Sequence, residues 1–238
     1  MNTVRRAVQV LVGGLCLAAT QSALSDEVQP GFYFGVSGGE ASFDDFGSKG
    51  QLDSIVQSAL RQNGFLLVPN SFRSTYEDSD TSLALFGGYH FNQYLSVEGG
   101  YIDLGAAEYR STGSFRRGVA TQSIATSIDV ETTGFTVAGL GSWPIGNVFE
   151  LHGRLGLFIS QTDLSVKLGS TGATGSSTDS LDSVGGYYGI GAGFNFAQHW
   201  SVSLDWTRYD NVGDEDEDDD VEAGFDIDAL SLSGTFRF

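Results

Sequence analysis

The last nine residues of the chain alternate between apolar and polar side chains up to the final position. One parity holds Leu230, Leu232, Gly234, Phe236 and Phe238, and the other holds Ser231, Ser233, Thr235 and Arg237. A period of two is typical of a β-strand with one apolar and one polar face. In the closing strand of a membrane β-barrel the apolar face meets lipid, the polar face meets the lumen, and an aromatic residue lies at the interface. The C-terminal pattern therefore predicts a barrel strand.

Seven earlier stretches have a comparable pattern and the length that a strand needs to cross a bilayer. The full set is 31–39, 81–91, 94–104, a fourth stretch that ends at Trp143, 148–166, 185–196, 200–209 and 225–238. The connections after the second, fourth and sixth stretches are short, whereas those after the first, third, fifth and seventh are long and polar. Short periplasmic turns alternate with long external loops in this way in outer-membrane barrels. The pattern predicts an all-β fold, an eight-stranded antiparallel up-and-down transmembrane β-barrel with four long external loops.

An eight-stranded soluble barrel or sandwich is the alternative, and it would turn the apolar faces inward. The aromatic residues favour the membrane barrel, because many of them lie beside the short turns or the C-terminus. They are Tyr89, Phe91, Tyr94, Trp143, Phe149, Phe194, Phe196, Trp200, Phe236 and Phe238. Such a ring at one level is typical of the aromatic girdle at a membrane interface.

Between the first two predicted strands, apolar residues recur at helical spacing. They are Leu52, Ile55, Val56, Ala59 and Leu60, and the apolar run 65–68 follows. The spacing predicts one short amphipathic helix in the first external loop. Such a helix could cap the barrel mouth, bind a partner or rest on the outer leaflet, and packing within the loop is the simpler interpretation.

The N-terminus has the features of a secretory signal peptide: Arg5 and Arg6 precede the apolar run 10–19, and Ala23 and Ser25 are the small residues of a cleavage site. We expect residues 1–25 to be removed, with cleavage after Ala23 as the alternative, and residues 26–238 to form the barrel domain. The apolar run is too short for a spanning helix; an apolar helix of the mature fold is the other interpretation. Cys16, the only cysteine, lies in this signal, so the mature chain would have neither a disulfide nor a thiolate.

Composition supports export and argues against one class of partner. Glycine accounts for 33 of 238 residues and aromatics for 12%, with only 3 prolines, which suits curved sheets with interfacial aromatics. The whole chain has a net charge of -18, and removal of Arg5 and Arg6 leaves 10 basic against 30 acidic residues. We expect no nucleic-acid partner, since so acidic a chain has no basic face to neutralise phosphates.

Three stretches carry a resemblance to a known family. Residues 88–101 (Gly-Tyr-His-Phe-Asn-Gln-Tyr-Leu-Ser-Val-Glu-Gly-Gly-Tyr) resemble the second hairpin of the OmpA-like transmembrane domain. The run 189–202 and the C-terminal Leu-Ser-Leu-Ser-Gly-Thr-Phe-Arg-Phe are similar to this domain too. The resemblance covers essentially the whole mature chain, and its motifs are shared by many small outer-membrane barrels.

The resemblance implies localisation in the outer membrane, with lipid and lipopolysaccharide as neighbours. It also implies periplasmic chaperones and an outer-membrane assembly machinery that reads the last strand through Phe236 and Phe238. One departure is that the family's signal usually has glycine five residues before the end, where Ser233 stands here. Because the chain ends with the predicted barrel, we expect no peptidoglycan-binding domain and do not carry cell-wall anchoring over.

Three charged residues share the predicted lumen parity: Glu98, Arg154 and Asp205. The interior of an eight-stranded barrel is just wide enough for side chains to fill, and isolated charges there are costly, so these residues should pair. The resemblance suggests a lumen salt-bridge cluster, which is a gate in some relatives; a structural plug is the alternative.

The run 214–220 consists of acidic residues only. Asp214, Asp216, Asp218 and Asp220 could supply oxygen ligands for calcium or bridge divalent cations to lipopolysaccharide phosphates. The EF-hand spacing fails, because Asp219 stands where glycine is required, and a solvated acidic loop is the simpler interpretation. We therefore assign no firm metal site and no cofactor.

Catalysis is not expected. The histidines His90, His152 and His199 all map to the periplasmic end of predicted strands, without an evident serine or aspartate partner at the outer leaflet. The sequence favours a structural and surface-interacting outer-membrane protein, which contributes to membrane integrity, adhesion or host contact through its loops. The alternative is a small porin-like channel with a salt-bridge gate.

Overall fold

The structure is a computed structural model that describes residues 30–44, 48–146, 148–170, 173–212 and 225–238. Within these ranges the elements are β1 (Gly31–Asp44), α2 (Lys49–Gln62), β2 (Leu66–Leu67), β3 (Arg73–Glu77), β4 (Ser79–His90), β5 (Leu95–Arg117), β6 (Ala120–Ile145), β7 (Phe149–Ser170), β8 (Ala173–Ala197), β9 (Trp200–Val212) and β10 (Phe225–Arg237). The expected signal peptide and the acidic run 214–220 lie outside the described residues.

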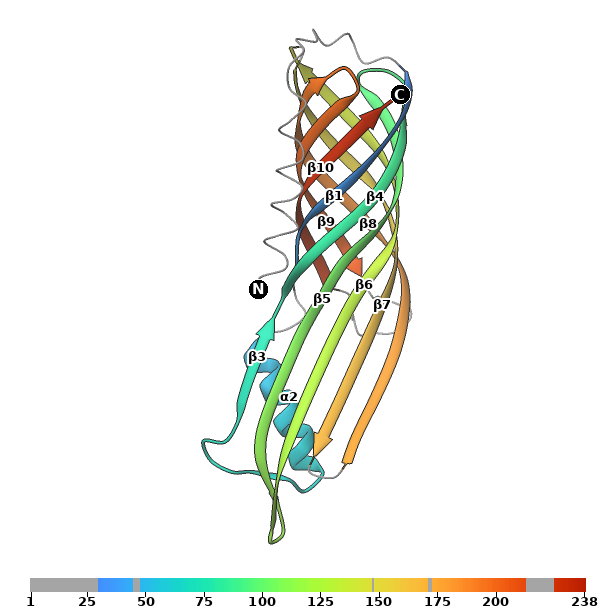
Figure 1. Ribbon diagram of the computed structural model, residues 1–238. Helices are drawn as coiled ribbons and strands as arrows, with labels where there is room; N and C mark the ends of the chain where they lie inside the picture. The colour runs from blue at the N-terminus through green and yellow to red at the C-terminus, as the bar shows by residue number, and fades with distance from the viewer. Residues whose placement is uncertain (1–29, 45–47, 147, 171–172, 213–224) are drawn as a thin grey trace.

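Eight of the described strands close into a ring in the order β1, β4, β5, β6, β7, β8, β9, β10. The ring closes where β1 pairs with β10, in a register that places Tyr33 opposite Arg237 and Asp44 opposite Asp226. All neighbouring pairs are antiparallel, and Figure 1 shows the strands tilted around the barrel axis. The predicted eight-stranded antiparallel barrel is confirmed.

The outer surface of the barrel carries an apolar band. On β7 the side chains that face away from the lumen are more than half exposed: Phe149, Leu151, Leu155, Leu157 and Ile159. This stretch has the length that a tilted strand needs to cross a bilayer, and the polar Gln161 and Asp163 follow it on the same parity. Among the described helices, none is long and apolar enough to cross a membrane.

The aromatic girdle lies at the end of the barrel where the short turns and the C-terminus are, which we call the turn end. There the ring of Phe236 contacts those of Phe34, Trp200 and Phe238, with centroids 4.9–5.8 Å apart. The backbone N–H of Phe238 also donates to the carbonyl of Phe32 at 3.1 Å. The last residue is therefore tied to the first strand rather than frayed.

The strand boundaries at the other end differ from the prediction. We expected long polar loops after Leu104 and Val166, whereas β5 continues to Arg117 and β7 to Ser170. The external segments are long, as expected, but β5 and β6 form one continuous hairpin whose connection is only Gly118 and Val119. In Figure 1, β5, β6, β7 and β8 extend well beyond the rest of the barrel.

A β-bulge at the barrel rim explains how β5 continues beyond the barrel as one uninterrupted strand. The register against β6 shifts between Asp103 and Ala106, and Gly105 has a positive φ of 77°. The carboxylate of Asp103 accepts the N–H of Gly105 at 2.9 Å, and that of Asp80 accepts the N–H of Ala106 at 3.0 Å. A Cβ at residue 105 would meet Asp80, so glycine suits this position for space as well as for φ.

The part of the molecule beyond this bulge has a core of its own. We call it the head and define it as residues 48–77, 106–131, 163–170 and 173–180. The predicted helix is present as α2, which begins with a capping box in which Ser48 and Gln51 satisfy each other's backbone N–H groups. Its buried residues Leu52, Val56 and Leu60 pack with Tyr109, Phe115 and Ile124 of β5 and β6. The helical spacing thus encodes packing of the first external segment against the β5–β6 hairpin.

The barrel interior is divided into two zones along its axis. Toward the head it is filled by buried apolar and aromatic side chains, which we call the apolar plug: Phe43, Leu104, Val130, Phe158, Tyr187, Tyr209, Val212, Phe225 and Ile227. Toward the turn end it is polar and charged. The sequence pattern predicts a polar face toward the lumen, and the structure differs because large apolar side chains also occupy inward positions near the head. The buried hydroxyls at this level bond to one another, Thr132 with Thr162 and Ser160 with Ser183.

We predict that the head can be destabilised without opening the barrel. Phe115 is 2% exposed, so Phe115→Ala should lower the stability of the head by about 3–5 kcal/mol, through lost burial and a cavity. Trypsin should then cut faster at Arg110, Arg116 or Arg117, while the mobility difference between boiled and unboiled samples on a detergent gel persists, because the barrel ladder is untouched.

Val119→Ala is the matched control, since Val119 is fully exposed at the hairpin end and should leave the cleavage rate unchanged. Unaltered cleavage of Phe115→Ala, or loss of its heat-dependent mobility shift, would contradict a separately packed head.

Candidate functional site

The charged zone of the lumen is built around one arginine. Arg154 of β7 donates from Nη2 to Oδ1 of Asp205 on β9 at 2.8 Å, and its Nη1 lies 3.7 Å from Oε1 of Glu98 on β5. Asp205 is 1% exposed and Glu98 is 6% exposed. The structure thus brings together the three residues that the sequence analysis placed on the lumen side. One guanidinium bridges three strands that are not neighbours in the sheet.

Asp205 is the hub of this cluster, because four groups donate to or approach its carboxylate. Besides Arg154, Nε2 of His152 lies 2.6 Å from Oδ1, and the hydroxyls of Ser203 and Ser233 donate to Oδ2 at 2.8 and 3.0 Å. A buried carboxylate is tolerated when it is both paired with a cation and saturated with hydrogen bonds. The packing around Asp205 meets both conditions.

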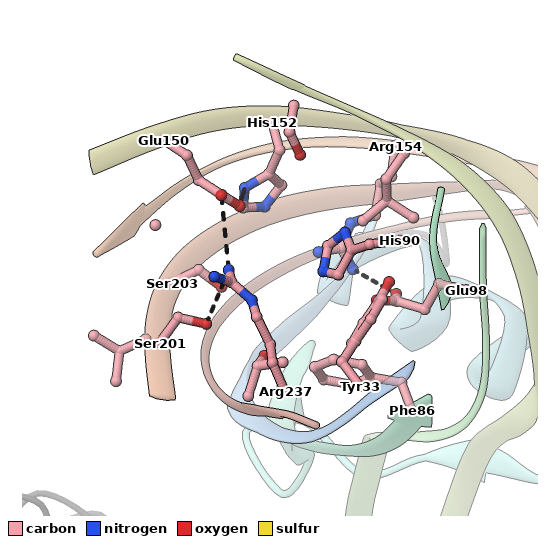
Figure 2. A pocket seen from close by; sticks show the side chains of 15 residues that line it. Tyr33, Phe86, His90, Glu98, Glu150, His152, Arg154, Ser201, Ser203 and Arg237 are labelled. Carbon is pink, nitrogen blue, oxygen red and sulfur yellow. Dashed lines mark hydrogen bonds and ion pairs between the residues drawn. The ribbon is translucent and has the colours of Figure 1, made fainter. Parts of the chain in front are cut away.

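Glu98 has a second partner of its own, since the hydroxyl of Tyr33 donates to its Oε2 at 3.1 Å. A further ion pair lies closer to the turn end, where Nη2 of Arg237 is 3.7 Å from Oε2 of Glu150. Figure 2 shows Arg237 and Glu150 facing each other across the lumen, with Ser201 beside the guanidinium. The charged zone therefore consists of two layers, an Arg237 layer and an Arg154 layer.

Two small cavities flank the Arg154 layer. The cavity on its turn-end side, shown in Figure 2, has a volume of ≈ 40 Å³ and is lined by His90, Glu150 and Arg237 among others. The cavity on its head side has a volume of ≈ 30 Å³ and is lined by Tyr187 and Tyr209 of the apolar plug. Phe86, Glu98 and Arg154 line both, so these three side chains lie between them. Each cavity can hold only a few water molecules.

The arrangement of His152, Asp205 and the serines does not activate a nucleophile. In a catalytic triad the histidine lies between the serine and the acid. Here the acid lies between them, because both serine hydroxyls donate to Asp205. In the described part of the chain, no group of three histidine, cysteine, aspartate or glutamate side chains is placed to hold a metal ion. The geometry supports electrostatic cross-linking of strands rather than chemistry.

Sequence reasoning missed His152, Tyr33, Ser203 and Ser233 as members of the cluster. His152 carried a usable signal, because it lies two residues before Arg154 on the same parity of one strand. The contacts of Tyr33 and the serines depend on how far apart strands lie across the barrel, which periodicity does not report. The proposed cation ligands Asp214, Asp216, Asp218 and Asp220 lie outside the described residues.

A third charged group lies on the outside of the barrel near its head end. Arg208 of β9 donates to Asp228 at 2.9 Å and to Asp226 at 2.6 Å, and lies within 3.6 Å of Asp44 and Asp210. It follows Trp206 of the apolar band on the same outward parity. The guanidinium links β9, β10 and β1 at the rim, where acidic residues would otherwise repel one another.

A polar contact fixes α2 to the head sheet. The hydroxyl of Tyr109 donates to Oδ1 of Asp53 at 2.7 Å, and Nζ of Lys49 lies 3.5 Å from Oδ2 of Asp53. Partial burial raises the pKa of Asp53, but hydrogen bonds from Ser74 and Tyr109 and the charge of Lys49 outweigh it, so the pKa falls below its usual 3.8. Burial and then the hydrogen bond to Asp53 raise the pKa of Tyr109 to about 12, which keeps this donor protonated.

A closed antiparallel barrel with an apolar outer band, an aromatic girdle and a filled interior defines a transmembrane β-barrel of the outer-membrane class. The family model of the OmpA-like transmembrane domain matches residues 28–238. The chain belongs to this family, and it is an outer-membrane protein.

Two curated relatives carry the same name in different bacteria. Outer membrane protein A of Serratia marcescens is 30% identical over 153 residues, which cover 64% of this chain and 38% of the relative. Outer membrane protein A of Yersinia pseudotuberculosis serotype I (strain IP32953) is 26% identical over 176 residues, which cover 71% and 43%. The chain therefore spans about two-fifths of the length of these relatives.

Among solved structures, Ail, the attachment invasion locus protein of Yersinia pestis, matches in its complex with the heparin analogue sucrose octasulfate. Its TM-score is 0.46 and its identity 15%, with 89% of this chain and 100% of that chain covered. OprG of Pseudomonas aeruginosa matches with a TM-score of 0.43 and 16% identity, covering 91% of this chain and 99% of that chain.

In outer-membrane barrels the short turns face the periplasm, which makes the turn end periplasmic and the head external.

We predict that Arg154 stabilises the finished barrel. Arg154→Ala leaves Asp205 and Glu98 uncompensated, and should lower the free energy of unfolding in micelles by about 3–5 kcal/mol if the site stays dry. Denaturant titration of the refolded protein measures this change. Arg154→Lys is the matched control and should recover part of the loss, because one ammonium cannot serve both carboxylates as a guanidinium does. Equal stability of all three proteins would contradict the assignment.

We predict that docking of α2 weakens in acid through Asp53. Its lowered pKa means that its contribution is complete above 3.8 and is lost as the pH falls through the folded-state pKa. Hydrogen exchange of residues 48–62, corrected for intrinsic rates, should show constant protection from pH 6 to about 4 and falling protection below. Asp53→Asn is the control and should be less protected at pH 6. A pH dependence identical in both proteins would refute the role of Asp53.

Proposed function

We propose that the protein is a closed outer-membrane scaffold that holds its head outside the cell for contact with other surfaces, with neither conduction nor catalysis. The observation that carries the proposal is the apolar plug. Phe158 and Ile227 are fully buried inside the barrel, and the ring of Tyr209 contacts those of Phe158 and Tyr187 with centroids 4.8 and 5.3 Å apart. An ion would have to shed its water to pass this layer.

The head supports the second part of the proposal, surface contact. It continues β5, β6, β7 and β8 of the barrel, and its own core and the Asp53–Tyr109 contact hold α2 in place. A rigid projection can present a binding surface beyond the layer of lipopolysaccharide. The surrounding lipid and lipopolysaccharide are the partners of the apolar band, and Phe236 and Phe238 are the proposed recognition signal for the outer-membrane assembly machinery.

A porin-like channel is the second candidate, and one observation favours it. The polar cavities on either side of Glu98 and Arg154 share these two residues as a wall. Movement of Arg154 away from Glu98, toward Asp205 alone, would join the cavities. The joined space would still end at the apolar plug, which is why we rank the channel below the scaffold.

Single-channel recording separates the two. We predict that the refolded mature protein in planar bilayers does not conduct, and that Arg154→Ala does not conduct either, because the apolar plug remains. Arg154→Ala combined with Phe158→Ala removes both barriers and should conduct. Phe158→Ala alone is the matched control and should stay closed at the Arg154 layer.

Stable openings of the unsubstituted protein, or openings produced by Arg154→Ala alone, would overturn the closed scaffold in favour of a channel gated by the ion pair.

A further inference from the structure

The basic residues of this acidic protein are concentrated at the far end of the head. The segments 54–76, 109–128, 164–170 and 173–178 contain no aspartate or glutamate. They contain Arg61, Arg73, Arg110, Arg116, Arg117 and Lys167, six of the ten basic residues that remain once the expected signal is removed. Within the described ranges, all of the acidic residues lie in the barrel and the near part of the head. Such a separation creates a positive end on a strongly negative molecule.

A row of acids marks the boundary of this end. Glu77, Glu108 and Asp129 lie opposite one another in register on β3, β5 and β6. Arg110 lies 2.8 Å from Glu108 and 3.8 Å from Asp129, and Lys167 lies 3.8 Å from Asp129. These two cations are paired with Glu108 and Asp129, and they offset two of the three negative charges of the row.

The remaining four arginines are Arg61, Arg73, Arg116 and Arg117, which we call the arginine tip. All four are exposed, and within the described ranges no carboxylate lies within 4.0 Å of any of them. Exposed cations that lack internal counterions are available to an external anion at little desolvation cost.

The fold gathers three members of the arginine tip into one place. Arg116 lies opposite Leu66 in the pairing of β5 with β2. The guanidinium of Arg117 stacks over the ring of Phe65 at 5.1 Å, and the carbonyl of Arg61 accepts the N–H of Gly64 at 3.0 Å. Residues 61–66 thus bring Arg61 to the hairpin end. Arg73 lies opposite Thr112, roughly 13 Å back along β5 at about 3.3 Å per residue.

The arginine tip lies too far from the protein's own membrane to bind its lipid phosphates, so its position favours an external ligand. From Gly105 to Arg117, β5 runs 13 residues beyond the bulge, roughly 40 Å of extended chain at about 3.3 Å per residue. Even with a strand tilt of about 45°, the tip stands roughly 30 Å above the rim. The lipid phosphates of the same outer leaflet lie far below it, and several Debye lengths of about 8 Å separate them.

The surroundings of the arginine tip suit a polysaccharide better than a protein partner. In the acid-free segments that the structure describes, the exposed large apolar residues are Ile55, Leu66, Val119 and Leu168, which are scattered, and no aromatic side chain is exposed. Protein interfaces concentrate their affinity in buried aromatic anchors, which this surface lacks. Serine, threonine, asparagine and glutamine predominate instead and can hydrogen-bond sugar hydroxyls.

We propose that the arginine tip binds sulfated polysaccharide outside the cell. Guanidinium groups engage the oxygens of sulfate with two parallel hydrogen bonds, which gives geometric preference as well as charge attraction. The acidic row and the acidic barrel confine binding to the tip. The inference rests on the proposed surface-contact function and names the ligand class for the head.

The test uses the refolded mature protein in nanodiscs of zwitterionic lipid, with dextran sulfate as probe and unsulfated dextran as its matched partner. Dextran sulfate should bind, more weakly as salt rises, and dextran should not bind. Arg116→Gln with Arg117→Gln should weaken binding by about tenfold or more, since two charge-assisted contacts are lost. Arg116→Lys with Arg117→Lys keeps the charge and should lose less than the glutamine pair.

The matched control is Gln93→Glu with Gln198→Glu, which lowers the net charge equally but at the periplasmic turns, and it should bind as the unsubstituted protein does. Heat-dependent gel mobility and protection of α2 from hydrogen exchange confirm folding of each variant.

Absence of binding, equal binding by the glutamine pair, or equal loss in the control pair overturns the proposal. So does equal binding, through the same arginines, of anionic phosphatidylglycerol vesicles or of polyglutamate. Conductance of the same preparations is measured separately. If the barrel does not conduct and dextran sulfate does not bind, the proposed polysaccharide binding is overturned while the closed scaffold stands.

Discussion

The structure depends on one constraint, that every backbone N–H and C=O inside a bilayer must find its partner within the protein. Eight antiparallel strands meet it by closing on themselves, and the pairing of β1 with β10 is the closing step. Closure then fixes the direction of the side chains along each strand, because alternate residues must face lipid and lumen. The same alternation that turns Leu155 and Leu157 outward turns Arg154 inward.

Inside the ring, a charged zone and an apolar zone follow each other along the barrel axis. The Arg154 layer links β5, β7 and β9 across the lumen, and the apolar plug fills the space between it and the head. Beyond the plug, the bulge at Gly105 lets the same strands leave the barrel and build a second core around α2. In the proposed closed scaffold, the barrel is the base in the membrane, and the head has a core and a surface of its own. That separation is what allows a positive tip on a negative molecule.

The membrane-crossing part was predictable because large apolar residues alternate there with small or polar ones, as in 148–159 and 230–238. The helix was predictable from its three-and-four spacing. The head strands were not predictable, because serine, threonine and glycine occupy ten of the 26 positions of 105–130. Ser111 and Gly113 lie on the same parity as Tyr109 and Phe115 and so hide the apolar face of this strand. The parity of the predicted strands was enough to group Glu98, Arg154 and Asp205. The bond of Asp205 to His152 could not be predicted, because it depends on the distance between β7 and β9, which the intervening β8 sets.

The orientation of a closed barrel with an external head is tested most directly by cysteine labelling on intact cells. Because the only native cysteine, Cys16, lies in the expected export signal, the mature protein carries just the cysteine that is introduced. Val119→Cys at the hairpin end should react with a membrane-impermeant maleimide on intact cells. Gln198→Cys in a short turn should react only after the outer membrane is permeabilised. Labelling of Gln198→Cys but not Val119→Cys on intact cells would contradict the account.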